Sequence, residues 1–206
     1  MEIFQSRDEI SQLIKFKESP VIAEIGVFEC EFSKKLHSWY NPKELHLFDT
    51  FRNFNVVGSG NVDGNDYRET TGEKIYNNAV DAFKNQPNVF LHEGFSNVTV
   101  AEMQDEYFDL IYIDGDHSEE GVYNDLINSY NKVKDHGWIT GHDFGLNKAK
   151  CKNNWDFSGI RRAVSRFCAV KNLQIDALFL DGCISFAIQK KSAIVYYSKS
   201  GLVVLK

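Results

Sequence analysis

The sequence of 206 residues has no closely spaced cysteines. Its four cysteines include no C-x-x-C pair, and the closest two, Cys168 and Cys183, are 15 residues apart. This spacing argues against both a disulfide framework and a zinc cluster. We therefore expect reduced thiols and a cytoplasmic protein.

Long apolar runs and an excess of positive charge are also missing. No run of 18 apolar residues is present, so we expect no membrane span. The first ten residues contain acids and no apolar core, so no secretory signal is expected. A net charge of −6 argues against a nucleic-acid partner, because such proteins carry a basic face.

The central stretch, residues 108–126, combines three patterns. The apolar run Asp109–Ile113 predicts a buried strand, and Asp114-Gly-Asp-His117 predicts a short polar loop. Apolar residues at helical spacing from Val122 onward predict a helix that begins at Ser118. Ligands of open α/β sheets bind outside the carboxyl ends of the strands, so this loop is a candidate for chemistry.

Similar units flank this stretch. A helix is predicted over 6–18 with Ser6 as its N-cap, and Gly137 is predicted to end the central helix. Polar loops are expected at 51–72 and 145–158, and long loops of this kind often bind ligands. Further strands are expected at 21–27, 45–49, 89–94 and 138–143, and further helices at 32–39, 73–85, 96–104 and 160–168.

The tail of the chain changes character. Residues 177–180 and 183–189 predict a hairpin, and 193–197 with 202–205 predict another. We expect an α/β fold, a Rossmann-like doubly wound and mostly parallel sheet with an antiparallel C-terminal hairpin. One domain would span residues 1–206, with a core at about 20–190 and an extension at 193–206.

Acids end four of the five strands predicted to be parallel. They are Glu24, Asp49, Asp114 and Asp143. Carboxylates gathered at one edge repel each other unless a positive charge lies among them. A sulfonium cofactor or a divalent metal would supply that charge.

These segments resemble class I S-adenosylmethionine-dependent methyltransferases, and within them the metal-dependent O-methyltransferases. That branch includes catechol O-methyltransferase, the macrolide sugar O-methyltransferases and the cephalosporin hydroxylase-like proteins. The resemblance is specific for fold and cofactor and not for substrate. It rests on Glu24–Ser33, Phe48–Phe51, Gly94–Ser96, Ile113–Asp125 and Gly137–Asp143.

The resemblance implies a cofactor site for S-adenosylmethionine. Glu24 and Gly26 would line the methionine end, Asp49 would bind the ribose hydroxyls, and Phe95 and Ser96 would lie beside the adenine. The residues expected to bind the cofactor are Glu24, Gly26, Phe28, Asp49, Thr50, Phe95, Ser96 and Asp114.

The resemblance also implies a divalent metal, with Mg²⁺ as the first candidate. Its ligands would be Asp114, His142 and Asp143, and His117 would be the catalytic base together with the metal-bound Asp114. Imidazole suits Mn²⁺ or Fe²⁺ better than Mg²⁺. Two departures from the family pattern are Cys30 in place of a glycine, and Phe144 in place of an asparagine ligand.

Several of these residues have simpler alternatives. Asp49 could stabilise only a turn, and Asp116 could either cap the following helix or bind metal. His142 could be a structural histidine instead of a ligand. The expected acceptor is a small polyhydroxylated molecule such as a sugar, by family analogy alone. The apolar stretch 193–205 is a candidate for pairing with a second chain in a homo-oligomer.

Other functions remain open. Asp114-Gly-Asp116 is also a D-x-D motif, which is typical of metal-dependent glycosyltransferases, but this interpretation leaves Glu24 and Asp49 unexplained. An NAD-dependent dehydrogenase is disfavoured because G-x-G-x-x-G is absent after the first strand. The departures at Cys30 and Phe144 keep open a non-catalytic binding module with the same fold.

Overall fold

The computed structural model describes residues 1–53, 71–150, 156–191, 194–198 and 201–205. The strands are β1 (Glu2–Phe4), β2 (Val21–Ile25), β3 (Glu44–Asp49), β4 (Val89–Glu93), β5 (Phe108–Ile113), β6 (Val133–Leu146), β7 (Ala177–Phe179), β8 (Cys183–Gln189), β9 (Ile194–Ser198) and β10 (Gly201–Leu205). The α-helices are α1 (Ile10–Leu13), α2 (Glu31–Tyr40), α3 (Gly72–Phe83), α4 (Ser96–Thr99), α5 (Glu119–Lys132) and α6 (Ser158–Lys171), and two 3₁₀ turns are η1 (Arg7–Glu9) and η2 (Phe51–Asn53).

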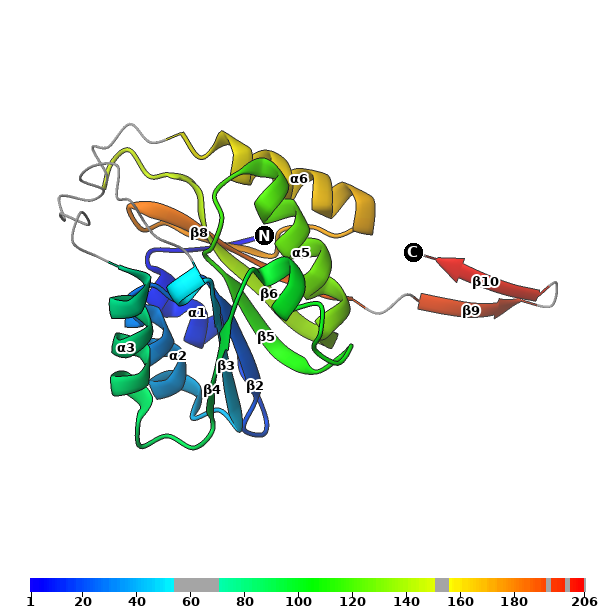
Figure 1. Cartoon of the computed structure of the whole chain (residues 1–206). Helices are drawn as coiled ribbons and strands as arrows, with labels where there is room; N and C mark the ends of the chain where they lie inside the picture. Colours follow the sequence, from blue (N-terminus) through cyan, green and yellow to red (C-terminus); the bar gives the residue numbers. More distant parts are fainter. Residues whose placement is uncertain (54–70, 151–155, 192–193, 199–200, 206) are drawn as a thin grey trace.

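Eight strands form one sheet in the order β1-β7-β8-β6-β5-β2-β3-β4 (Figure 1). The five adjacent strands β6, β5, β2, β3 and β4 are parallel. β8 runs antiparallel to both of its neighbours, β6 and β7. The short β1 pairs with β7 in parallel at the edge. This Rossmann-like α/β sheet with antiparallel C-terminal strands confirms the predicted fold class.

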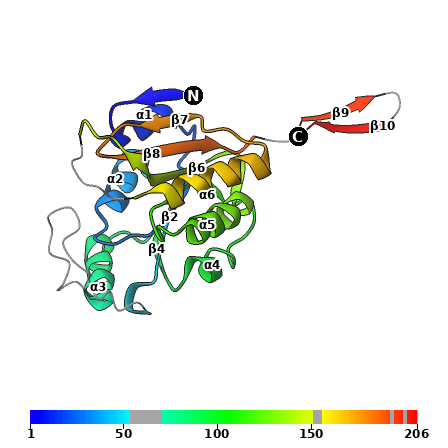
Figure 2. The ribbon, with the colours of Figure 1, turned by 90° about the horizontal axis from the view of Figure 1, so that it is seen from above.

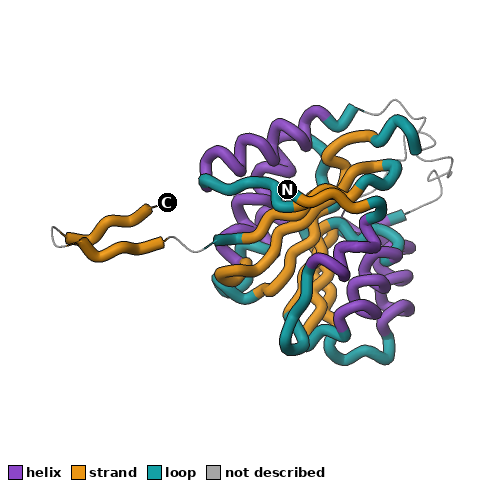
Figure 3. Tube along the Cα trace, turned by 180° about the vertical axis from the view of Figure 1, so that it is seen from behind, coloured by secondary structure: helices purple, strands orange, loops and turns teal. Residues whose placement is uncertain are grey.

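Helices cover both faces of the sheet (Figure 3). Alternate residues of β5 point to opposite faces, so Ile111 and Ile113 belong to one apolar core and Leu110 and Tyr112 to the other. The first core packs against α5 and α6, and the second packs against α1, α2 and α3. Parallel strands covered on both faces read as continuous apolar runs, which explains the pattern of residues 109–113.

The central unit has the predicted structure. β5 ends at Ile113, and the side chain of Ser118 caps α5 by accepting a hydrogen bond of 3.1 Å from the Gly121 amide. The five residues between strand and helix, 114–118, therefore lie at the carboxyl edge of the sheet. Gly26 follows β2 at the same edge, and its amide donates to the Phe48 carbonyl at 2.9 Å.

The predicted N-terminal helix over 6–18 is too long. Ser6 is an N-cap and forms a capping box with Glu9, but the helix that follows ends at Leu13, and Ile14 is extended. Ile10 and Ile14 are fully buried, so their spacing reports burial and not a continuing helix. The preceding β1 is too short to leave a periodic signal in the sequence.

The predicted helix end at Gly137 is wrong. α5 ends at Lys132, and Gly137 lies inside β6. The left-handed residue of this segment is His136, with φ 62°. A Cβ atom at Gly137 would approach Val133 Cγ1 to 2.8 Å, so this glycine permits close packing instead of ending a helix.

The two predicted loops are only partly within the described residues. The first begins with η2 and ends where α3 starts at Gly72, and residues 54–70 lie outside the described part of the chain. The second begins later than predicted because β6 continues to Leu146, and residues 151–155 also lie outside it.

Both predicted hairpins at the end of the chain are present. β7 and β8 pair antiparallel within the large sheet, and β9 and β10 form a separate two-stranded sheet. Figures 1 and 2 draw this second pair apart from the large sheet. Among the described residues, no helix is long and apolar enough to cross a membrane.

Candidate functional site

The turns after β2 and β5 touch each other at the carboxyl edge of the sheet. Gly26 has φ +85°, and a Cβ atom added there would lie 2.2 Å from the Asp114 carbonyl oxygen. The Asp114 amide donates to the Ile25 carbonyl at 2.7 Å. Glycine at position 26 therefore permits the contact that brings the acid of β5 beside β2.

Glu24 is buried beneath this contact. Its side chain is 2% exposed and accepts a hydrogen bond from the Ser33 hydroxyl. The pKa of Glu24 is raised to about 8, chiefly by burial and to a smaller extent by the charges of Asp114 and Asp49, while the hydrogen bond from Ser33 and the charge of Arg7 oppose the shift. A cation bound at this edge would favour the ionised form of this carboxyl.

Asp49 organises the turn after β2. Its Oδ2 accepts hydrogen bonds from the amides of Val27 at 2.8 Å and Phe28 at 3.1 Å. Its Oδ1 accepts from the Phe51 amide at 3.0 Å and the Thr50 hydroxyl at 3.3 Å. Asp49 therefore has the alternative role of stabilising a turn, and ribose binding stays a prediction.

Phe95 and Ser96 lie at the same carboxyl edge, where β4 leads into α4. The Phe95 side chain is 59% exposed, which leaves an aromatic surface beside the site. The Ser96 hydroxyl donates to Asp125 Oδ1 at 2.5 Å. Asp125 is 3% exposed, and burial raises its pKa to about 6.

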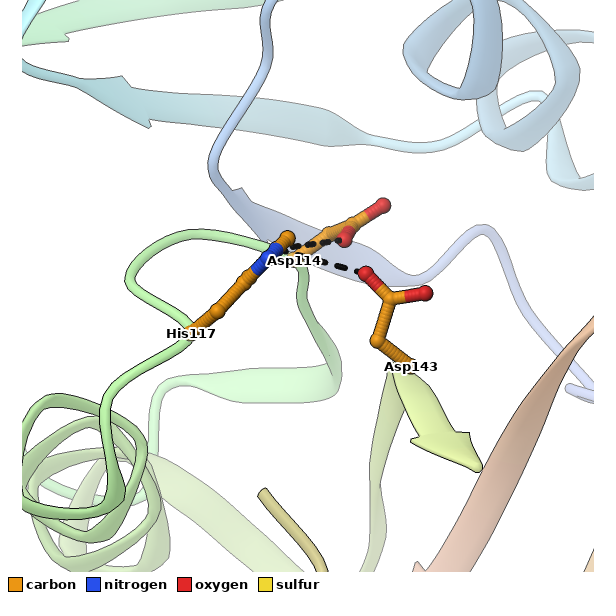
Figure 4. Close-up of side chains that lie close together, drawn as sticks. All are labelled: Asp114, His117 and Asp143. Carbon is orange, nitrogen blue, oxygen red and sulfur yellow. Dashed lines mark ion pairs between the residues drawn. The ribbon is translucent and has the colours of Figure 1, made fainter. Parts of the chain in front are cut away.

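Asp114, His117 and Asp143 point toward one another (Figure 4). One ligand atom from each of the three lies within 4.8 Å of the others, as a metal site would require. His117 Nε2 is 3.3 Å from Asp143 Oδ2 and 3.9 Å from Asp114 Oδ1. Asp143 lies within β6 at φ 55°, where the pairing with β8 shifts register between Gly141 and Gly145.

His142 joins this cluster from the same strand. Its Nδ1 is 3.2 Å from Asp143 Oδ1 and 3.6 Å from Asp114 Oδ2. Both aspartates therefore lie between two imidazoles. The predicted ligand His142 is not one of the three residues grouped around the potential metal site, and its structural and ligating roles both stay predictions.

The charges of the cluster are strongly coupled. Burial acts to raise the pKa of Asp114, but its interactions with His117 and His142 outweigh this and hold the pKa well below its usual range. Burial raises the pKa of Asp143. The pKa of His117 is raised, chiefly by Asp114 and then by Asp143 against the opposing effect of burial. The cluster thus holds two acids and a strengthened base within a few ångströms.

Asp116 has a local role. Its Oδ1 accepts from the Ser118 amide at 2.8 Å, and its Oδ2 accepts from the Ser118 hydroxyl at 3.0 Å. It orders the loop before α5 and is not one of the three residues grouped around the potential metal site. The two predicted roles of Asp116 were helix capping and metal binding. The geometry favours a role at the start of α5, where Asp116 supports the N-cap residue Ser118.

Cys30 and Phe144, the two departures from the family pattern, both have structural roles. Cys30 is fully buried and has φ 62°, the left-handed region in which glycine costs least. The Phe144 ring lies 6.0 Å from that of Phe186, so it packs against β8. Neither position contributes a further carboxylate or amide to the cluster.

Comparison with known proteins agrees with this geometry. Residues 26–144, more than half of the chain, match the family model described as a methyltransferase domain. The chain belongs to the methyltransferase-domain family. No curated protein matches the sequence significantly.

Three solved structures of other proteins are similar in fold to this chain. Fibrillarin from Aeropyrum pernix, in complex with S-adenosyl-L-methionine, is 12% identical with a TM-score of 0.59, over 87% of this chain and 71% of that one. The O-methyltransferase NovP is 16% identical with a TM-score of 0.58, over 90% and 76% of the two chains. N-methyltransferase NodS from Bradyrhizobium japonicum is 12% identical with a TM-score of 0.56, over 90% and 92%.

Family and fold together support an S-adenosylmethionine-dependent methyltransferase. The names of the similar structures include both an O- and an N-methyltransferase, so the fold alone does not select the acceptor atom.

Two residues of the site of this methyltransferase escaped the sequence analysis. Arg7 reaches the carboxyl edge of the sheet from η1, and no pattern in the sequence connects it with β5. Asp125 did leave a signal, because it interrupts the buried stripe formed by Val122, Leu126 and Ser129 on α5. A charged residue on the apolar face of a helix is uncommon unless it has a partner, which here is Ser96.

Proposed function

We propose that this protein is an S-adenosylmethionine-dependent O-methyltransferase of the metal-dependent branch. Its acceptor would be a hydroxyl of a small polyhydroxylated molecule such as a sugar. The observation that carries the proposal is the cluster of Asp114, His117 and Asp143, whose ligand atoms lie within 4.8 Å of one another. It stands at the sheet edge where α/β enzymes bind their ligands.

The residues at this edge fit the cofactor. S-adenosylmethionine is a sulfonium with an ammonium and a carboxylate at one end and an adenine at the other. Asp114 offers negative charge beside the Gly26 turn, Glu24 would ionise next to a bound cation, and the exposed ring of Phe95 offers an apolar surface for a base. We assign cofactor binding to Glu24, Gly26, Phe28, Asp49, Thr50, Phe95, Ser96 and Asp114.

The donor set of the cluster also fits a divalent metal. Two carboxylates and an imidazole are common ligands for Mn²⁺, Fe²⁺ or Zn²⁺, whereas Mg²⁺ prefers oxygen alone. Asp114 and Asp143 would be ligands in each case, and the third would be His117 or His142. A bound metal would lower the pKa of a coordinated acceptor hydroxyl by Lewis acidity.

The residues of the chain would complete the reaction. S-adenosylmethionine would supply the methyl group: an acceptor oxygen would attack the methyl carbon in line, the O–C bond would form as the C–S bond breaks, and S-adenosylhomocysteine would leave. His117 is 52% exposed, and its imidazole can therefore meet an acceptor from the solvent side. It would take the hydroxyl proton at Nε2, and Asp143 Oδ2 at 3.3 Å would stabilise the resulting imidazolium.

A glycosyltransferase is the less favoured alternative. That function would need Asp116 as a metal ligand, but both oxygens of its carboxylate already accept hydrogen bonds from Ser118. Two further features stay predictions: a cytoplasmic location, and one domain over residues 1–206.

Manganese titration of the purified protein tests the metal site. We expect the wild type and Asp116→Asn to bind one Mn²⁺, and Asp114→Asn and Asp143→Asn to lose binding by at least about tenfold. Calorimetry and the electron paramagnetic resonance of free Mn²⁺ measure this. Equal binding by all four proteins would contradict the assignment.

His117→Ala separates a base from a ligand. If His117 is the base, the variant should keep Mn²⁺ and S-adenosylhomocysteine binding but lose about 100-fold or more in turnover. Turnover is measured as S-adenosylhomocysteine formed from S-adenosylmethionine with a panel of sugars and polyols. Full turnover by the variant would end the proposal for His117, and loss of Mn²⁺ would make it a ligand.

A further inference from the structure

Arg7 is a half-buried cation beside the acids of the site. Its guanidinium carbon lies 4.9 Å from the centre of the Phe32 ring, and its Nη1 donates to the Tyr112 hydroxyl at 3.3 Å. Its backbone amide donates to Asp181 Oδ2 at 2.7 Å, which fixes η1 against the turn between β7 and β8. The guanidinium is thus held by an aromatic face and a phenol.

The position of Tyr112 brings Arg7 to the carboxyl edge of the sheet. Tyr112 is fully buried, pairs with Glu24 across β2 and β5, and precedes Asp114 by two residues on the same face. The charges of Asp114 and Asp181 act on Arg7, and that of Arg7 acts on Glu24. Arg7 therefore belongs to the electrostatics of the site although it is far away in sequence.

The guanidinium has no carboxylate partner within the described residues. Three other arginines, Arg52, Arg162 and Arg166, form ion pairs with Glu93, Glu119 and Glu120. Arg7 forms none, and of its five N–H donors only one has a hydrogen bond among the residues described. A cation that is partly withdrawn from water and still unpaired has donors available for an anionic ligand.

We propose that Arg7 binds a carboxylate of a ligand at the carboxyl edge of the sheet. The planar guanidinium suits a carboxylate because it can donate two parallel hydrogen bonds. Two sources share this chemistry: the amino-acid end of S-adenosylmethionine and an acidic acceptor. The first rests on the proposed function and is the expected one, because Glu24, an acid that would attract the ammonium of the same amino-acid group, pairs with Tyr112, the hydrogen-bond partner of Arg7.

Calorimetry with three ligands tests the proposal. S-adenosylhomocysteine carries the carboxylate, decarboxylated S-adenosylhomocysteine lacks it, and 5′-methylthioadenosine lacks the whole amino-acid group. We expect Arg7→Gln to weaken S-adenosylhomocysteine binding by about 10- to 100-fold, as loss of a charge-assisted pair would. Binding of the two ligands without a carboxylate should stay within about twofold of wild type.

Arg7→Lys and Arg166→Gln are the matched variants. Arg7→Lys keeps the charge without the planar fork and should retain part of the affinity. Arg166→Gln removes an exposed arginine that is paired with Glu120, and this variant should bind all three ligands as wild type does. Thermal unfolding of each variant verifies that it is folded, and Arg7→Lys replaces Arg7→Gln if the latter is not.

The acceptor arm uses the protein saturated with S-adenosylhomocysteine. If Arg7→Gln binds S-adenosylhomocysteine and D-glucose as wild type does but loses binding of D-glucuronate, the carboxylate that Arg7 binds is that of the acceptor. Equal losses for ligands with and without a carboxylate, or no loss in either arm, would overturn the role of Arg7. Failure of the wild type to bind S-adenosylhomocysteine would instead overturn the proposed function, and with it the cofactor as the source.

Discussion

Gly26 joins two loops of the site at a single backbone contact. Its φ of +85°, and the 2.2 Å that would separate an added Cβ from the Asp114 carbonyl oxygen, leave no room for a side chain. We expect Gly26→Ala to lower the free energy of unfolding by about 3 kcal/mol or more, from strain and steric overlap together. Urea denaturation measures the change.

Gly145→Ala is the control for Gly26. A Cβ there would meet Ile184 Cδ1 at 3.7 Å, an ordinary contact, and no left-handed φ is involved. Its effect on unfolding should stay below about 1 kcal/mol. Similar losses for the two alanine variants would show that the close approach at Gly26 is not the cause.

Asp125 makes stability depend on pH. Burial raises its pKa from 3.8 to about 6, so the folded protein binds this proton more tightly than the unfolded chain does. Its contribution is therefore fully present below about pH 4 and is lost as the pH rises through about 6. Asp125→Asn, which still accepts from Ser96, should be more stable than wild type at pH 8 by about 1 to 3 kcal/mol.

Urea denaturation of both proteins at pH 4 and pH 8 provides the measurement. The gain from Asp125→Asn should shrink at pH 4, where the carboxyl is protonated in the folded state and partly protonated in the unfolded chain. Asp81→Asn removes a charge from an exposed position on α3 and should show little difference between the two pH values. A gain that does not depend on pH would refute the role of burial.

At the scale of elements, the loop that carries the site depends on the start of α5. Ser118 Oγ accepts from the Gly121 amide at 3.1 Å and donates to Asp116 Oδ2 at 3.0 Å. We expect Ser118→Ala to cost about 1 kcal/mol of unfolding free energy, the usual loss of an N-cap. Thermal unfolding of both variants measures this. Ser165→Ala, at an exposed position inside α6, is the control and should be neutral or slightly stabilising.

Elements with a strong period were predictable from the sequence. The apolar run of β5 and the spacing of Val122 and Leu126 in α5 report burial on the covered faces of a parallel sheet, which few other structures allow. The end of α1 was not predictable, because Ile14 is buried whether or not the helix continues. Gly137 was wrongly predicted as a helix end because glycine occurs at sites of close packing as well as at helix ends.

The site followed from the same logic only in part. Asp114 and Asp143 end or interrupt neighbouring parallel strands, so topology alone brings them to one edge. Their contact with His117 depends on side-chain directions that spacing does not encode. Arg7 comes from a short 3₁₀ turn at the start of the chain, and its approach to Tyr112 is set by the docking of β1 on β7.

At the scale of the whole molecule, the C-terminal hairpin is separate from the large sheet. β9 and β10 pair only with each other in the described residues. We expect a chain that ends at Lys191 to unfold within about 2 °C of the full-length protein, because a two-stranded hairpin that shares no strand pairing with the large sheet adds little stability. Differential scanning calorimetry of both chains measures this.

The same truncation tests the predicted homo-oligomer. If residues 193–205 pair with a second chain, light scattering should show a larger assembly for the full chain than for the truncated one. A full chain that is monomeric at high concentration would remove that prediction. A drop in unfolding temperature of about 5 °C or more at low concentration would instead place the hairpin against the core.

Asp143 stands in a left-handed conformation, inside a disturbed stretch of β6, with a buried carboxyl group. For folding alone this is an unfavourable choice, since glycine would accept the backbone angle and carry no charge to desolvate. If Asp143 is a ligand of the proposed metal, an Asp143→Gly chain should therefore melt at the same or a higher temperature than wild type and bind Mn²⁺ more weakly. Under the proposed function, stability and metal binding would place opposite demands on this one position, and selection for stability alone would favour loss of the metal ligand.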